Sequence, residues 1–192
     1  MLHQIIKPFV FSFSLILLSW LVSRFIINKN SHRKKYPLSK EILIVAFLVY
    51  LAWVLCLTLL PIPVTSKSPV YKQVNMVPVV YSVQQYKAAF HGTIGYLKEL
   101  YLQNLFGNIL LFIPFGFLLP MILKYKTFKR IFYFALLFSI TIELSQFAAH
   151  YFGSFRSVDI DDILLNVIGA IIGFFFYKSF QQLSAKQEMS TG

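Results

Sequence analysis

The sequence reads LFGNILLFIPFGFLLPMIL from Leu105 to Leu123, a run without a single ionisable side chain. A helix needs about 20 predominantly apolar residues to cross the hydrocarbon core of a bilayer. Two similar runs precede it and two follow it: Pro8–Ile27, Ile42–Leu60, Ile131–Ala149 and the shorter Ile163–Tyr177. We therefore expect an all-α protein, a polytopic membrane helix bundle with about five transmembrane helices.

The composition fits a chain whose solvent is lipid and excludes a soluble globular domain. Of the 192 residues, 57% are hydrophobic and 13% are charged, an apolar content above that of typical soluble domains. The net charge of +11 would suit nucleic-acid binding, but the basic residues flank the apolar runs as juxtamembrane anchors do. We expect the lipid bilayer as a partner and no nucleic acid.

The distribution of Lys and Arg predicts the orientation in a bacterial plasma membrane, because cytoplasmic loops are enriched in both residues. Twelve of the eighteen lie in or beside the first loop, in the third loop and after the last span. With five spans these regions share one side, which places the N-terminus outside and the C-terminus in the cytoplasm. The second loop, Pro61–Gln103, is then external. Its part Gln84–Gln103 has the apolar spacing of a helix lying in the membrane interface.

Polar side chains inside the last three spans are the candidate functional residues, because such groups are costly in lipid and face protein or water. At helical spacing they form three faces: Asn104 and Asn108; Ser139, Glu143, Gln146 and His150; and Asp159, Asp162, Asn166, Gly169 and Gly173. The predicted topology brings these faces together beneath the outer surface, where we expect a polar pocket.

Several of these residues have a structural as well as a functional interpretation. Glu143 could simply join helices by hydrogen bonding, and the spacing of Gly169 and Gly173 indicates close helix packing. Arg156, on the connection between the last two spans, could pair with a carboxylate or hold a phosphate or carboxylate ligand. Pro114 and Pro120 are expected to kink or break the third span.

Three runs together resemble the VanZ-like family of membrane proteins: NLFGNILLFIPFGFLLP (Asn104–Pro120), SITIELSQF (Ser139–Phe147) and RSVDIDDILLNVIGAIIGF (Arg156–Phe174). The upstream VNMVP (Val74–Pro78) is similar to an Asn-x-x-Pro element of the same family, so the resemblance covers about Val74–Tyr177. The resemblance carries the family motif onto Asn75, Pro78, Asn108, Pro114, Gly116, Glu143, Gln146, Asp159, Asp162, Asn166, Gly169 and Gly173. Asp161 and His150 fall outside it and rank lower.

The resemblance implies a role in the cell envelope and in susceptibility to glycopeptide antibiotics such as teicoplanin, to which the family's name-giver raises resistance. The expected ligand is a lipid headgroup, a cell-wall precursor or the antibiotic itself. The candidate pocket comprises Asn75, Asn104, Asn108, Glu143, Gln146, Arg156, Asp159, Asp162 and Asn166, with Pro114, Gly116, Gly169 and Gly173 in helix packing. We expect no cofactor and no resident metal.

The alternative is an integral-membrane enzyme that acts on an envelope lipid or cell-wall precursor. Glu143 would then be the general acid or base, and Asp159 and Asp162 its partners or ligands of a divalent cation. A small transporter with Glu143 as a proton relay ranks last, because the inner halves of these spans are apolar. No arrangement of a classical nucleophile appears, and whether the chain is an enzyme stays open.

The chain is expected to divide into three parts. Residues 1–73 hold two N-terminal transmembrane helices and the start of the external loop. Residues 74–180 form the VanZ-like membrane domain, and residues 181–192 a mobile cytoplasmic tail.

Overall fold

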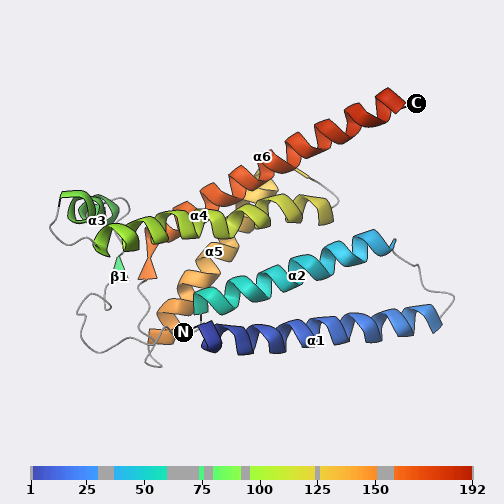
Figure 1. The fold of residues 1–192 in the computed structure, drawn as a ribbon, viewed down its shortest axis with the longest axis horizontal. Coiled ribbons are helices and arrows are strands. Elements are labelled where there is room, and N and C mark those ends of the chain that lie inside the picture. The colour runs from blue at the N-terminus through green and yellow to red at the C-terminus, as the bar shows by residue number, and fades with distance from the viewer. Residues whose placement is uncertain are drawn as a thin grey trace. The chain divides into compact units, whose positions relative to one another are not determined.

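The structure, a computed structural model, describes residues 2–29, 37–59, 74–75, 80–91, 96–123, 126–150 and 158–191. The elements in chain order are α1 (Leu2–Lys29), α2 (Leu38–Leu59), β1 (Val74–Asn75), α3 (Val80–His91), α4 (Tyr96–Ile122), α5 (Phe128–His150), β2 (Val158–Asp159) and α6 (Ile160–Thr191) (Figure 1). Within these residues, five helices are long and apolar enough to cross a membrane: α1, α2, α4, α5 and α6. The predicted all-α class and the five spans are confirmed.

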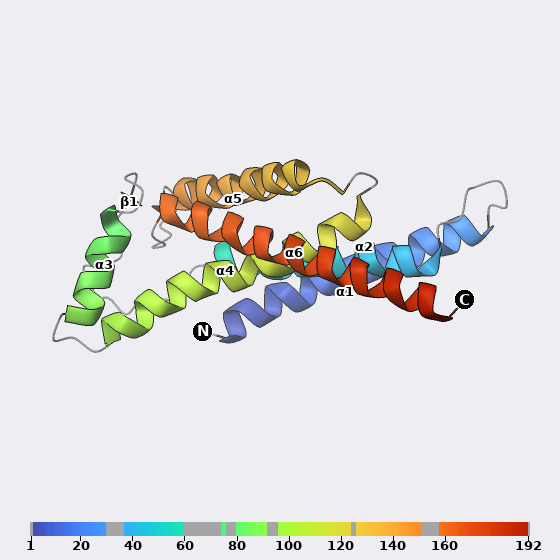
Figure 2. The same ribbon diagram turned by 90° about the horizontal axis from the view of Figure 1, so that it is seen from above.

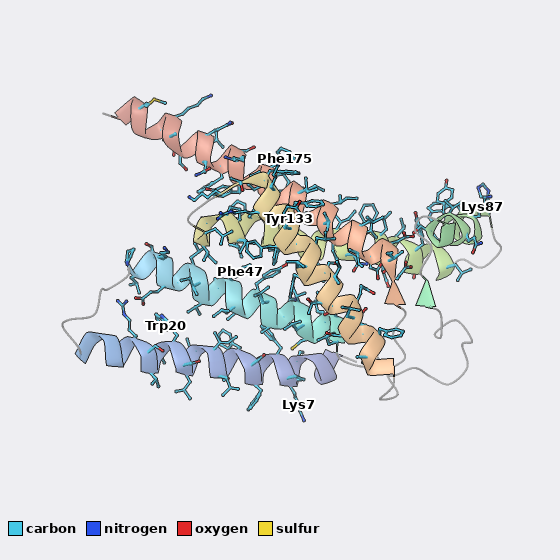
Figure 3. The ribbon with its side chains drawn as sticks, turned by 180° about the vertical axis from the view of Figure 1, so that it is seen from behind. Lys7, Trp20, Phe47, Lys87, Tyr133 and Phe175 are labelled. Carbon is cyan, nitrogen blue, oxygen red and sulfur yellow. The ribbon has the colours of Figure 1, made fainter. Side chains whose placement is uncertain are left out.

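Contacts divide the chain into two compact units, Met1–Pro63 and Val64–Gly192. The first unit is a hairpin of α1 and α2. Its two helices meet where the Phe9 ring packs edge-on against Trp53, with centroids 4.7 Å apart, and where Arg24 pairs with Glu41 at 2.5 Å. Figure 3 shows Trp20 projecting from α1 toward α2, whereas Lys7 projects away from it.

The second unit is built on α4, α5 and α6, and it carries every residue of the candidate site. In Figure 1 α4 (green to yellow) and α6 (orange to red) run in the same direction. The helix that connects them in the chain, α5, runs in the opposite direction. In the turned view of Figure 2, α6 crosses α4 near the middle of the two helices. α4 and α6 are therefore parallel neighbours, and both helices begin at the same end of the unit.

Three glycines allow α4 and α6 to approach until backbone meets backbone. A Cβ atom added to Gly169 would lie 2.1 Å from the carbonyl oxygen of Ile109, and one on Gly173 would lie 2.0 Å from that of Ile113. A Cβ atom on Gly116 would lie 1.8 Å from the carbonyl oxygen of Ala170. Ordinary contact begins at 3.4 Å, so no larger residue fits at these three positions without moving a helix. We call this contact the glycine seam.

Two predicted helices differ clearly in extent from those of the structure. The predicted interfacial helix Gln84–Gln103 is wrong in extent: α3 ends at His91, and the residues from Tyr96 onward already belong to α4. The last span, predicted as Ile163–Tyr177, is the 32-residue helix α6, which runs through the expected tail as far as Thr191. The first residues of the tail, QQLSAKQ (Gln181–Gln187), contain Gln, Leu, Ala and Lys, which favour the helix, so the helix does not end where its apolar run ends.

The two prolines expected to kink or break the third span lie inside α4, which continues from Tyr96 to Ile122 through both of them. A break at Pro114 or Pro120 is therefore excluded. Pro120 is among the most deeply buried side chains. Prolines are tolerated in transmembrane helices because neighbouring helices and side chains satisfy the backbone groups that lose their hydrogen bonds.

Candidate functional site

The polar side chains of the second unit gather at one end, where α4 and α6 begin and α5 ends. Four of them are carboxylates: Glu143 on α5, and Asp159, Asp161 and Asp162 at the start of α6. Glu143, Asp159 and Asp161 are buried, and Asp162 is half-buried. Negative charge is favoured at a helix N-terminus by the unpaired amides and the helix dipole, so α6 itself accounts for part of this acidic cluster.

Asp159 caps α6, and Glu143 supports the cap from the neighbouring helix. The Oδ1 atom of Asp159 accepts a hydrogen bond from the amide of Asp161 at 2.9 Å, as an N-cap side chain does. The amide of Asp159 in turn donates to Oε2 of Glu143 at 3.1 Å. In a capping box the residue three positions after the cap would accept this hydrogen bond. Here that residue is Asp162, and because Glu143 accepts the bond instead, Asp162 is left to interact with α4.

Asp162 joins α6 to a row of amides on α4. The Nδ2 atom of Asn104 donates to Oδ1 of Asp162 at 3.1 Å, and Nδ2 of Asn108 donates to Oδ1 of Asn104, also at 3.1 Å. Asn104 is exposed, whereas Asn108 and Asp162 are half-buried. This amide–carboxylate row is thus the accessible part of the cluster, and its two amides lie in the stretch of α4, Leu97–Ile122, that is long and apolar enough to cross a membrane.

A second polar contact lies one helical turn deeper than Asp162 and Glu143. The Nδ2 atom of Asn166 donates to Oγ of Ser139 at 2.8 Å, and both side chains are buried, at 3% and 0% exposed. The Oδ1 atom of Asn166 has no hydrogen-bond partner among the described residues. This pair links α5 to α6 and resembles the interhelical polar contacts that hold transmembrane helices together. Ser139 was noticed for its spacing but was not predicted as a site residue.

Asp161, which falls outside the family motif, also belongs to this acidic cluster. It is 6% exposed, and its carboxylate accepts a hydrogen bond from the hydroxyl of Ser82 on α3. The contact ties α3 to the start of α6. The two residues are separated by 79 positions, and neither helical spacing nor the family motif relates them. The one local signal was the position of Asp161 in the first turn of a helix.

The structure describes some of the remaining predicted site residues. Gln146 is buried at 6% exposed, about one turn from Glu143 on α5. The backbone of Asn75 lies in β1, which pairs in parallel with β2 so that Asn75 stands opposite Asp159 and Val74 opposite Val158. Arg156 and Pro78 lie outside the described residues, as does the side chain of His150.

The arrangement has the chemistry of a hydrogen-bond acceptor site. Its carboxylates and amide oxygens suit a ligand that brings hydroxyl, amide or ammonium donors. Within the described residues no group of three His, Cys, Asp or Glu side chains could hold a metal ion. The enzymatic alternative therefore has candidate acids and bases in the described residues but no such metal-holding group.

Comparisons with known proteins agree on one family. The VanZ/LLP1 family pattern matches residues 47–181, which extends upstream of the resemblance seen in the sequence and includes most of α2. Protein VanZ of Enterococcus faecium is 33% identical over 75 residues, which are 39% of this chain and 44% of that relative. The match thus spans less than half the length of the relative. No solved structure matches the chain.

Proposed function

The chain belongs to the VanZ/LLP1 family, and from this premise we propose that it is a bacterial envelope protein that binds an amphiphilic ligand at its polar end. Binding would alter susceptibility to glycopeptide or lipoglycopeptide antibiotics such as teicoplanin. The ligand would be a lipid headgroup, a lipid-linked cell-wall precursor or the antibiotic itself. Each of the three can present hydroxyl, amide or ammonium donors, which carboxylates and amide oxygens accept.

The amide–carboxylate row of Asn108, Asn104 and Asp162 is the observation that carries the proposal. Polar side chains in a membrane span are costly and usually serve function. The buried contacts of Glu143, Asp159 and Asn166 have a structural explanation in the cap of α6 and in helix packing. The row, by contrast, is partly exposed at a depth where apolar side chains would be less costly than its polar ones.

Exposed apolar side chains elsewhere on α4 indicate that the row lies at membrane depth. Phe106 and Leu110 are 54% and 62% exposed, as expected of side chains that face acyl chains, and their spacing from Asn104 and Asn108 places them on the other side of the helix. A ligand with a polar head and an acyl or prenyl tail would therefore reach the row from within the bilayer, with its tail among the acyl chains. This chemistry favours a membrane-embedded ligand over a freely soluble one.

The proposed orientation places the row beneath the extracytoplasmic surface. The described basic residues Lys126, Lys129 and Arg130 lie at the start of α5, and Lys178 lies on α6 beside it. These positions are at the end of the unit opposite the acidic cluster, and cytoplasmic regions are enriched in Lys and Arg. Glycopeptides act outside the membrane, so this orientation is the one the proposed function requires.

Susceptibility testing of a deletion strain carrying variants of this chain tests the proposal. Asp162→Asn keeps the shape and the acceptor for Asn104 but removes the charge, and we expect it to be as susceptible to teicoplanin as the deletion strain. Glu99→Gln, a change at an exposed carboxylate in the first turn of α4, is the matched control and should behave as the parent protein. If Asp162→Asn protects the strain from teicoplanin as well as the parent protein does, at an equal protein level, the proposal of ligand binding at the row is wrong.

Glu143 separates the binding protein from the enzyme. Gln at this position keeps an oxygen that accepts the Asp159 amide, whereas Ala removes it and leaves a buried donor unpaired. If Glu143 only positions the cap, Glu143→Gln should protect as the parent does and Glu143→Ala should fail. Failure of both variants at normal protein levels would instead favour Glu143 as a general acid or base, and lipid profiling of the strains would then identify the accumulated substrate.

A further inference from the structure

The end of the second unit opposite the acidic cluster carries a concentration of positive charge. Its exposed residues are Lys126, Lys129 and Arg130 around the start of α5, and Lys178 on α6. We call these four residues the basic end. They come from separate elements, which the contacts of Phe128 with Phe174 and Phe175 bring together at ring-centroid distances of 6.0 and 6.5 Å. Figure 3 shows Tyr133 and Phe175 in the same region, where α5 starts beside α6.

Two of the lysines lie over adjoining aromatic rings of α6. The Nζ atom of Lys126 is 5.5 Å from the centre of the Tyr177 ring, and that of Lys178 is 5.8 Å from the centre of the Phe174 ring. The two rings are themselves 6.3 Å apart. Cation–π contacts of this kind restrain an ammonium group without neutralising its charge. The two lysines thus lie over neighbouring rings and keep their positive charge.

Lys126 and Lys178 have no carboxylate beside them among the described side chains. Neither Lys126 nor Lys178 forms an ion pair within the described part of the chain. The acidic side chains described in this unit lie at the start of α4, on the last turns of α5 and at the start of α6. Glu188 follows Lys178 by ten positions, which is about 15 Å along a helix. An anion from outside the protein would be a suitable partner for these two lysines.

The position of the basic end along the spans identifies the source of that anion. Lys126 precedes by two residues the span that begins at Phe128, so its charge lies at the edge of the hydrocarbon core. Tyr177 is the kind of residue that concentrates at this depth. Phospholipid phosphates lie in the same layer, and anionic lipids attract juxtamembrane Lys and Arg.

The continuation of α6 beyond Lys178 adds an apolar surface to the basic end. Phe176, Phe180 and Leu183 are spaced by four and three positions and are 55%, 50% and 63% exposed, so they form one stripe on the helix. Lys178 and Lys186 lie away from this stripe. A helix with an apolar stripe and a basic face is typical of segments that contact the lipid headgroup region.

We propose that the basic end is a binding site for the phosphate headgroup of an anionic phospholipid, with Lys126 and Lys178 as its principal contacts and the exposed stripe of α6 against the acyl chains. This site is separate from the amide–carboxylate row. It makes no use of the proposed antibiotic phenotype and can be tested independently of it.

Native mass spectrometry of the full chain in neutral detergent, titrated with phosphatidylglycerol, tests the proposal. Each lysine near an anionic headgroup contributes about fivefold in affinity. The double variant Lys126→Gln/Lys178→Gln should therefore bind phosphatidylglycerol about 25-fold more weakly, and Lys126→Arg/Lys178→Arg should restore binding. The matched control is Lys87→Gln/Lys98→Gln at the other end, where Lys98 likewise lies over an aromatic ring, Phe90, at 5.1 Å. This control should bind as the parent does.

Three results would overturn the proposal. The first is equal binding of phosphatidylcholine, which would remove the dependence on headgroup charge. The second is an equal loss of affinity in the Lys87→Gln/Lys98→Gln control, which would make the effect one of net charge. The third is full competition by inorganic phosphate at the same concentration, which would indicate a site for a soluble anion. Retained helix content and a monodisperse elution profile establish that the variants are folded.

Discussion

Replacing Gly169 by Ala is the sharpest test of the glycine seam. The new Cβ atom would lie 2.1 Å from the carbonyl oxygen of Ile109, so α4 and α6 must separate by about 1.3 Å to reach the 3.4 Å at which ordinary contact begins. Overpacking of this kind costs about 1–3 kcal/mol. The Asn104–Asp162 hydrogen bond, 3.1 Å long, joins the same two helices, so their separation should lengthen it and weaken the amide–carboxylate row as well.

Gly107→Ala is the matched control for this prediction. Gly107 lies in the interior of α4, but a Cβ atom there would meet nothing within 4 Å. Both variants gain the same helix propensity, up to about 1 kcal/mol, so their difference isolates the steric cost. We expect Gly169→Ala to be less stable than Gly107→Ala by about 1–3 kcal/mol, measured by unfolding in mixed micelles. Equal stability of the two variants would refute the close approach of α4 and α6 at Gly169.

Three further predictions concern the cap, a buried hydroxyl and the orientation. Asp159→Ala should destabilise the protein by about 1 kcal/mol, whereas Asp159→Asn, an equally good cap, should not. If the two variants had equal thermal unfolding midpoints, the result would argue against capping by Asp159. Tyr177→Phe should leave the midpoint unchanged or raise it, because the Tyr177 hydroxyl is buried without a hydrogen-bond partner among the described residues; a lower midpoint would reveal a partner for it. In a Cys56→Ser background, an impermeant thiol reagent on intact cells should label Lys87→Cys and spare Lys126→Cys, and the reverse pattern would place the amide–carboxylate row in the cytoplasm.

The spans were predictable because their signal is local. Apolar runs of sufficient length mark helices in lipid whatever their partners are, and the structure confirms five of them. The end of α6 was not predictable in this way, because helical hydrogen bonds continue into a polar segment when its residues favour the helix. The boundary between α3 and α4 was missed for the opposite reason: the spacing of Leu97 and Tyr101 is helical, but it belongs to the start of α4.

The candidate site was predictable only as far as spacing along single helices reaches. Helical periodicity grouped Asn104 with Asn108, and the topology placed them at the same end as Asp162. Whether a carboxylate caps a helix or meets a ligand depends on contacts across the fold. The hydrogen bond from the Asp159 amide to Glu143 and the one from Ser82 to Asp161 are of this kind. Because these contacts give Glu143 a structural role, Asp162 becomes the stronger candidate for ligand binding.

The parallel pairing of α4 with α6 also constrains how the protein is made. Asn104 finds its partner Asp162 only after 58 further residues have been added to the chain, which takes about 3–12 s at ordinary translation rates. During that interval the amides of α4 are already made, but Asp162 and the α6 glycines that α4 will contact are not. The nascent protein must therefore be sheltered at the insertion machinery until its last helix emerges, and a message truncated before Ile160 should yield a product that cellular proteases remove.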